Sequence, residues 1–158
     1  MSDRLPMTRG GYEVLRERLS RLKTTERREV SREIEIARGH GDLRENADYD
    51  AAKNKQGMIE ANIRDLEDKL ARAEVIDVAS LSGDRVVFGA TVSISDNATG
   101  TEQTVQIVGE VEADTKVGKI SVTSPLARAL VGKSVGDLVK AQTPGGTREF
   151  EIVDVVFR

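Results

Sequence analysis

The stretch GHGDLREN, residues 39–46, separates two long runs of helical periodicity and decides the fold of the first half of the chain. Two glycines flank a histidine where the first run ends, and glycine is the residue that most often closes helices. Asp42 and Glu45 precede the second run, and acidic side chains favour the start of a helix. We therefore expect two long antiparallel helices joined by a short acidic turn, with the tip at about residues 39–46.

The two runs predict a narrow coiled-coil seam between the arms of this hairpin. Apolar and small side chains recur three or four residues apart, which places them on one face of each helix. In the first run, Glu26 stands where the pattern expects an apolar residue. Each arm has about 30 residues, or roughly 45 Å at the rise of an α-helix. The seam positions are Tyr12, Leu15, Leu19, Leu22, Val30, Ile34 and Ala37, followed by Ala47, Ala51, Lys55, Met58, Ile59, Ile63, Leu66, Leu70 and Ala73.

The second half of the chain has the alternation of apolar and polar residues that is typical of strands. In the last strand the inward phase shifts to Val153, Val155 and Phe157, which indicates a β-bulge or a twist. We expect a mainly antiparallel sheet whose strands lie around residues 90–94, 105–107, 120–122, 138–143 and 150–152.

One short helix interrupts these strands. Ser124 is a suitable N-cap, Pro125 suits the first helical position, and Gly132 ends the helix. The predicted fold class is therefore α+β in two domains. An antiparallel α-helical coiled-coil hairpin covers residues 1–78, and a globular antiparallel sheet with a short helix covers residues 79–158.

The composition excludes several classes of protein. The 24 basic and 27 acidic side chains nearly cancel, which argues against a general nucleic-acid coat protein. The chain has no cysteine, so we expect neither disulfides nor thiolate metal sites, and His40 alone cannot form a two-histidine zinc site. No apolar run approaches the roughly 20 residues of a membrane span. We expect a cytoplasmic protein that does not contact a membrane.

Asp42 and Glu45 are the candidates for chemistry. A carboxylate followed three residues later by Glu, ahead of a helix, is the pattern of a capping box, which is the ordinary structural interpretation. The functional interpretation needs a partner, because Mg²⁺ prefers six oxygen ligands and two exposed carboxylates cannot hold it tightly. Offered to a site that already holds a metal and phosphates, the pair could complete a second metal site or orient a water.

Several motifs resemble one family over nearly the whole chain. They are HGDLRENADY at 40–49, PMT at 6–8, VID at 75–77, FGATV at 88–92, SPLARAL at 124–130 and TPGG at 143–146. In register, these motifs resemble the bacterial Gre transcript cleavage factors, closest to the GreA branch.

The resemblance implies an N-terminal coiled-coil hairpin and a C-terminal globular domain with an FKBP-like fold. It further implies binding at the rim of the secondary channel of bacterial RNA polymerase, with the hairpin directed toward the polymerase active centre. There the factor stimulates the polymerase's own cleavage of backtracked nascent RNA, so the chain is expected to be an activator and not an enzyme by itself. A monomer is expected when the factor is free.

The resemblance also implies roles for particular residues. Asp42 and Glu45 would act in trans as the catalytic pair and would share Mg²⁺ with the polymerase, so that the isolated protein holds no metal stably. A basic patch near the tip would contact the displaced 3′ end of the nascent RNA through Arg38, Arg44, Lys53 and Lys55. The short helix would dock on the polymerase through Ser124, Pro125, Leu126, Ala127 and Arg128.

Three other interpretations compete with this one. A related inhibitor would occupy the secondary channel without stimulating cleavage, although such relatives carry extra acids at the tip. A peptidyl-prolyl isomerase would suit an FKBP-like fold, but its pockets are lined by aromatic residues, and this domain has only Phe88, Phe150 and Phe157. A plain coiled-coil scaffold would keep its function after Asp42→Asn.

Overall fold

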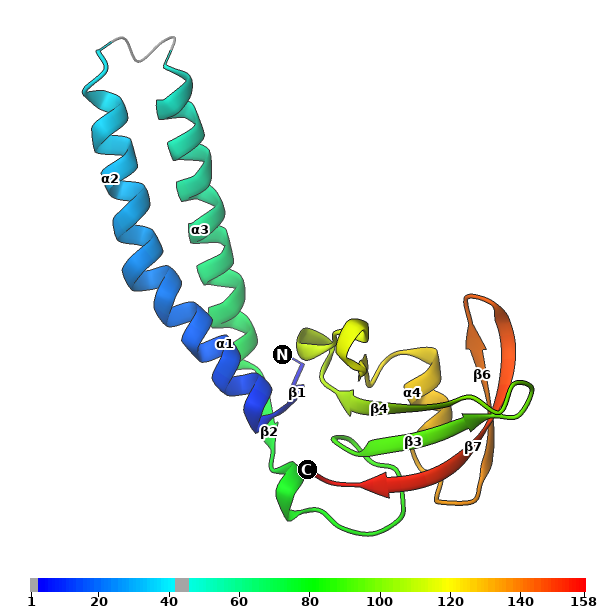
Figure 1. Cartoon of the computed structure of the whole chain (residues 1–158). Helices are drawn as coiled ribbons and strands as arrows, with labels where there is room; N and C mark the ends of the chain where they lie inside the picture. The colour runs from blue at the N-terminus through cyan, green and yellow to red at the C-terminus, as the bar shows by residue number, and fades with distance from the viewer. Residues whose placement is uncertain (1–2, 42–45) are drawn as a thin grey trace. The chain divides into compact units, whose positions relative to one another are not determined.

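The structure is a computed structural model that describes residues 3–41 and 46–158, and the chain divides into two compact units. The hairpin unit comprises residues 12–72, and the globular unit comprises residues 1–11 and 73–158 (Figure 1). The boundary predicted between residues 78 and 79 lies inside the globular unit, because strand β1, Leu5–Thr8, pairs in parallel with β2, Ala73–Ile76. None of the helices in the described part of the chain combines the length and apolar character of a membrane span.

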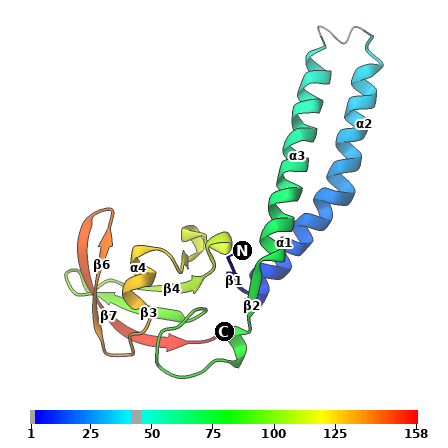
Figure 2. The ribbon, with the colours of Figure 1, turned by 180° about the vertical axis from the view of Figure 1, so that it is seen from behind.

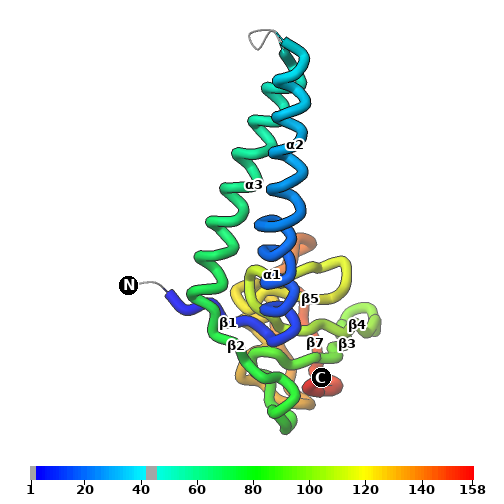
Figure 3. The backbone as a smooth tube through the Cα atoms, turned by 90° about the vertical axis from the view of Figure 1, so that its left-hand side faces the viewer, coloured from blue at the N-terminus to red at the C-terminus, as the bar shows by residue number. Residues whose placement is uncertain are grey.

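The hairpin unit consists of two helical arms that lie side by side in Figures 1 and 3. The first arm is built from α1, Arg9–Arg21, a π-helical turn at Leu22–Glu26, and α2, Arg27–Arg38. The second arm is the single helix α3, Ala47–Ala71. The predicted seam is confirmed at its centre, but Met58 is 68% exposed and does not belong to it. Nearer the tip the prediction is wrong as well, since Ala51 and Lys55 are exposed and Ala52 is buried in their place. The buried seam consists of Leu22, Val30, Ile59, Ile63 and Leu66, with Leu15 and Leu19 packed against them.

The π-helical turn explains how the first arm keeps its seam on one face past Glu26. Leu22 and Val30 are both buried against α3 although eight positions separate them along the chain. Eight residues make about 2.2 turns of a regular α-helix, which would carry Val30 off the seam. A π-helical turn takes up one extra residue, so Val30 returns to the face of Leu22.

Ion pairs link the exposed edges of the arms. Lys23 pairs with Glu67 at 3.1 Å, and Arg27 pairs with Glu60 at 2.7 Å. The hydrogen bond from Arg27 lowers the pKa of the Glu60 carboxyl. Since these side chains are largely exposed, each pair contributes little to the stability of the unit.

The globular unit is built on a five-stranded sheet with the order β5-β4-β3-β7-β6. The predicted strands are all present, and every neighbouring pair is antiparallel except β4 and β5, which run parallel. The short helix α4, Pro125–Leu130, packs against the sheet beside β6 (Figure 2). The strands are β3 Thr91–Asp96, β4 Glu102–Val108, β5 Lys119–Ser121, β6 Leu138–Thr143 and β7 Gly146–Val156, and 3₁₀ turns lie at Val78–Ser80, Glu110–Glu112 and Thr115–Val117.

The predicted bulge in the last strand is confirmed. Ser93 pairs with Asp154 and the next residue, Ile94, pairs with Ile152, so Val153 is the extra residue. Ile152 and Val155 are buried on the two sides of the bulge. The inward orientation predicted for Val153 is wrong, since this side chain is 41% exposed.

Glu112 joins the start of the first arm to the rest of the globular unit. Its carboxylate accepts hydrogen bonds from Thr8 N at 2.9 Å, Thr8 Oγ1 at 2.5 Å and Gly109 N at 2.9 Å. Thr8 Oγ1 in turn accepts from Gly11 N at 3.1 Å, which makes Thr8 the N-cap of α1. The glycines at 11 and 109 are needed here, because a Cβ at either position would lie about 2 Å from a neighbouring oxygen atom.

Candidate functional site at the hairpin tip

The predicted catalytic residues Asp42 and Glu45 lie outside the described residues, as does Arg44 of the predicted basic patch. The structure does describe both ends of the tip. Helix α2 ends at Arg38, and α3 begins at Ala47. Gly39, His40 and Gly41 continue from α2 with backbone hydrogen bonds to its last carbonyl groups, and Gly41 has a φ of 102°, which favours glycine.

Asn46 is the N-cap of α3. Its backbone is extended, with φ −92° and ψ 95°, and its Oδ1 atom accepts a hydrogen bond from Tyr49 N at 3.0 Å. The N-cap directly precedes the first helical residue, so the capping box predicted with Asp42 as the cap is wrong for this helix. The N-cap of α3 is therefore Asn46, and Asp42 and Glu45 lie outside the described residues.

The same asparagine also contacts the other arm. Its Nδ2 atom donates to the carbonyl oxygen of Ala37, in the last turn of α2, at 2.5 Å. Asn46 is 8% exposed and Ala37 is 3% exposed, so this contact is largely protected from water. Sequence reasoning missed this residue as a structural tie, although asparagine directly before a helix is a recognisable N-cap signal.

A shallow groove of about 350 Å³ lies between the arms near the tip. His40 Nδ1 lies 3.7 Å from Asp48 Oδ2 at one end of it, and both side chains are more than half exposed. Ile36 lines the groove and is 59% exposed. The groove is lined by Glu33, Ile36, Ala37, His40, Asp48, Ala51, Ala52 and Lys55.

The basic residues predicted to contact RNA are exposed where they are described. Arg38 lies at the end of α2. Lys53 Nζ donates to Gln56 Oε1 at 3.1 Å, and Lys55 Nζ pairs with Glu33 Oε1 across the arms at 3.1 Å. Contact of these residues with RNA stays a prediction.

The helix predicted to dock begins as expected. Ser124 Oγ accepts a hydrogen bond from Ala127 N at 3.2 Å, and Pro125 occupies the first helical position. Pro125 and Arg128 are exposed and Leu126 is half-buried. Ala127 is fully buried, so its methyl group packs into the core and offers no external contact. Docking through this helix stays a prediction.

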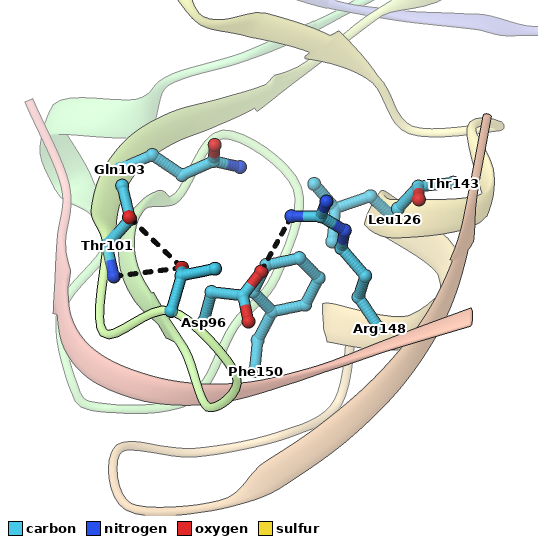
Figure 4. Close-up of a pocket in the computed structure, with 8 residues that line it drawn as sticks. Asp96, Thr101, Gln103, Leu126, Thr143, Arg148 and Phe150 are labelled. Carbon is cyan, nitrogen blue, oxygen red and sulfur yellow. Dashed lines mark hydrogen bonds and ion pairs between the residues drawn. The ribbon is translucent and has the colours of Figure 1, made fainter. Parts of the chain in front are cut away.

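A pocket of about 300 Å³ lies beside α4 in the globular unit (Figure 4). Arg148 Nη1 donates to Asp96 Oδ2 at 2.8 Å, and Ala98 N donates to Asp96 Oδ1 at 2.8 Å. The bond from Ala98, and then the bond from Arg148, hold the pKa of the Asp96 carboxyl below its usual value. The sequence marks Asp96 only as the first residue of a turn, and nothing in it joins Asp96 to Arg148. The pocket is lined by Asp96, Thr99, Thr101, Gln103, Leu126, Thr143, Arg148 and Phe150.

This pocket does not resemble the aromatic-lined site that a prolyl isomerase would need, because Phe150 is its single aromatic residue. Among residues 3–41 and 46–158, no three histidine, cysteine, aspartate or glutamate side chains lie close enough together to hold a metal ion.

Comparison with known proteins identifies a family for each half of the chain. Residues 5–75 match the family of the N-terminal domain of transcription elongation factors, and residues 81–157 match the C-terminal domain family of GreA/GreB transcription elongation factors. Two curated relatives are both named transcription elongation factor GreA. The relative from Phenylobacterium zucineum is 57% identical, with 97% of this chain and 98% of that protein covered. The relative from Trichlorobacter lovleyi is 53% identical, with 99% of each chain covered.

Among solved structures, the crystal structure of GreA factor homolog 1 (Gfh1) of Thermus thermophilus is 33% identical, with 97% of this chain and 99% of that chain covered and a TM-score of 0.44. The two matched domain families together account for nearly all of the sequence, and the curated relatives align from end to end. The chain therefore belongs to the GreA/GreB family of transcription elongation factors.

Proposed function

We propose that this chain stimulates the cleavage of backtracked nascent RNA by RNA polymerase and so rescues arrested elongation complexes. Its hairpin enters the secondary channel of the polymerase, and its globular unit docks at the channel rim. The proposal is supported by the tip sequence DLREN at residues 42–46 and by the end-to-end similarity to proteins named transcription elongation factor GreA. The chain acts in the cytoplasm, where the polymerase works.

The observation that carries the proposal is the N-cap of α3. Asn46 supplies the hydrogen bond that starts this helix, so neither Asp42 nor Glu45 is required to cap it. The N-cap role that a capping box would assign to Asp42 is thus filled by Asn46. We infer that the two carboxylates serve a partner.

The dimensions of the hairpin suit delivery of these acids. Helix α3 has 25 residues, which corresponds to about 37 Å at the rise of an α-helix. The seam between the arms is narrow, and the groove near the tip is shallow. A long, thin hairpin with charged side chains on its surface can enter a channel. The site that binds the substrate then belongs to the partner.

The donor set of the tip fits a shared Mg²⁺ and does not fit one held alone. Mg²⁺ prefers six oxygen ligands in octahedral geometry, and two carboxylates supply too few of them. Asp42 and Glu45 would hold the ion together with polymerase groups, and when bound it would polarise a phosphate oxygen and lower the pKa of a coordinated water. The carboxylates of this chain orient the attacking water. The chain is then an activator of the polymerase active site.

Docking belongs to the face of α4 that carries Ser124, Pro125 and Arg128. Pro125 and Arg128 are exposed there, whereas Ala127 and Leu130 anchor the helix in the core. A rigid helix on a packed sheet gives the partner a fixed surface, which limits the entropy lost on binding. Leu126 adds an apolar contact where it borders the Asp96–Arg148 pocket.

A defined elongation complex tests the proposal. Backtracked complexes with labelled nascent RNA are incubated with Mg²⁺ and with the wild-type chain, Asp42→Asn, Glu45→Gln or the double variant. We expect a short 3′ fragment with the wild type and a loss of about 100-fold or more with the double variant, since positioned groups of this kind typically contribute 10²–10⁴-fold. Docking of the double variant should equal that of the wild type. Failure of the wild type to release RNA, or full activity of the double variant, contradicts the proposal. Docking of the wild type without cleavage would indicate the inhibitor instead.

A further inference from the structure

Asn46 stands out among the described residues near the tip because both polar atoms of its side chain bind helix ends. Oδ1 accepts from Tyr49 N in the first turn of α3, and Nδ2 donates to Ala37 O in the last turn of α2. Asn46 is 8% exposed, and it and Asp96 are the buried polar residues among those that the structure describes. A buried polar side chain with two specific partners fixes the groups that it joins.

The chemistry of the position requires an amide. The last carbonyl groups of α2 form the negative pole of that helix and attract a donor, while the first amides of α3 form the positive pole and attract an acceptor. An asparagine side chain carries one group of each kind on a short stem. A carboxylate would satisfy α3 but would repel the α2 carbonyl, and a hydroxyl on a single carbon would cap α3 without reaching the other arm.

The other tie at the same level of the hairpin is weaker. His40 and Asp48 approach to 3.7 Å, but their side chains are 53% and 78% exposed. Exposed ion pairs contribute little to stability. Among the described residues, Asn46 therefore makes the better-protected contact between the arm ends.

We propose that Asn46 is a positioning residue for the cleavage reaction: by clamping the end of α2 to the start of α3, it holds the tip so that Asp42 and Glu45 meet the polymerase site in one arrangement. This role rests on the proposed function. Pre-ordering the ends of a segment lowers the entropy that its residues lose when they engage a partner. Loss of the clamp should therefore lower the rate of cleavage and weaken the use of Mg²⁺, with docking unchanged.

Two substitutions separate the clamp from the N-cap. Asn46→Ser keeps a capping hydroxyl and loses the donor to Ala37, and Asn46→Asp keeps a strong cap but opposes a carboxylate to that carbonyl. Ile59→Ala is the matched control, because Ile59 is buried in the seam and this change loosens the hairpin with the Asn46 contacts intact. For each variant we would measure polymerase binding, the cleavage rate at saturating factor, and the Mg²⁺ concentration that gives half of the maximal rate.

We expect Asn46→Ser to cleave about tenfold more slowly at saturating factor, the size that corresponds to the loss of one ordinary hydrogen bond. Asn46→Asp should be slower still. Both should need severalfold more Mg²⁺ and bind polymerase as the wild type does, while Ile59→Ala should show the wild-type Mg²⁺ dependence. Wild-type rates and Mg²⁺ dependence in both Asn46 variants would overturn the proposal. A change in Mg²⁺ dependence of equal size in Ile59→Ala would overturn it as well, because the effect would then be one of hairpin stability.

A measurement on the free protein keeps this inference distinct from the proposed function. Spin labels attached at positions 38 and 50, by way of Arg38→Cys and Asp50→Cys, report the distance between the arm ends. We expect this distance distribution to broaden in Asn46→Ser and to stay as in the wild type in Ile59→Ala. An unchanged distribution in Asn46→Ser overturns the clamp. Absence of cleavage by the wild-type chain overturns the function, and with it the positioning role.

Discussion

At the junction around Glu112, we expect the effect of Gly11→Ala on stability to change sign according to whether the Glu112 side chain is present. The Glu112 carboxylate accepts three hydrogen bonds, from Thr8 N, Thr8 Oγ1 and Gly109 N. Glu112→Ala leaves these donors without that partner in a half-buried site. We expect the globular unit to lose about 3 kcal/mol of unfolding free energy, since hydrogen bonds to charged groups contribute about 1.5–3 kcal/mol each and water recovers part of the loss.

Gly11→Ala should produce nearly the same loss by a different route. The added Cβ would lie 2.0 Å from Glu112 Oε1 and 2.4 Å from its Cδ, so the carboxylate must swing away and give up its hydrogen bonds. In the Glu112→Ala background that obstacle is absent. There the same change should stabilise by about 0.5–1 kcal/mol, because alanine is the better helix residue and Gly11 lies in α1.

Gly109→Ala is the matched control. Its added Cβ would lie 2.1 Å from the backbone oxygen of Pro6, which cannot rotate away as a side chain can. This substitution should therefore destabilise in both backgrounds. Native-state hydrogen exchange at the amides of β3 and β7 reads the free energy of the globular unit by itself. An equal cost of Gly11→Ala with and without the Glu112 side chain would refute this account of the junction.

Three further predictions concern the seam, the π-helical turn and the pocket. Val30→Ala should cost the hairpin about 2 kcal/mol, because the side chain is fully buried, while Ile36→Ala should cost far less; thermal unfolding followed by circular dichroism compares them. Deletion of the exposed residue Thr25 should be tolerated, because it converts the π-helical turn into regular helix with Val30 still on the seam. Deletion of Arg32 should instead shift the residues after it off the seam, and so lower the helical content and the midpoint of thermal unfolding. Asp96→Asn should destabilise the globular unit at pH 7, and its difference from the wild type should shrink as the pH falls. The pKa of Asp96 is lower in the folded protein than in the unfolded chain. Its contribution to the free energy of unfolding is therefore fully present above the unfolded pKa of about 4 and is lost as the pH falls through the folded pKa. Urea unfolding between pH 7 and pH 2.5 measures this, and a difference between variant and wild type that stays constant with pH would contradict it.

Features that depend on neighbours in the sequence were predicted well. The hairpin, the centre of its seam, the cap at Ser124 and the bulge near Val153 all follow from spacings of a few residues. The prediction of Asp42 as a cap failed because two residue types suited to that position lie four apart, Asp42 and Asn46. A preference shared by both residues cannot choose between them. Asn46 also donates to the carbonyl oxygen of Ala37 in the other arm, a contact that capping preference does not predict.

The sequence by itself determined the family, the two-part architecture and the tip acids, because helical and strand periodicity and capping are local and the motifs of the family are contiguous. Only the tertiary structure decided which side chains meet across long separations. The contacts in question are the parallel pairing of β1 with β2, the hydrogen bonds of Thr8 to Glu112, the Asp96–Arg148 ion pair, and the hydrogen bond from Asn46 to Ala37. Each of these contacts depends on where two segments are held by the packing of the remaining chain. Apolar periodicity marks which face of an element is buried, but burial is non-directional and does not specify which partner residue that face meets.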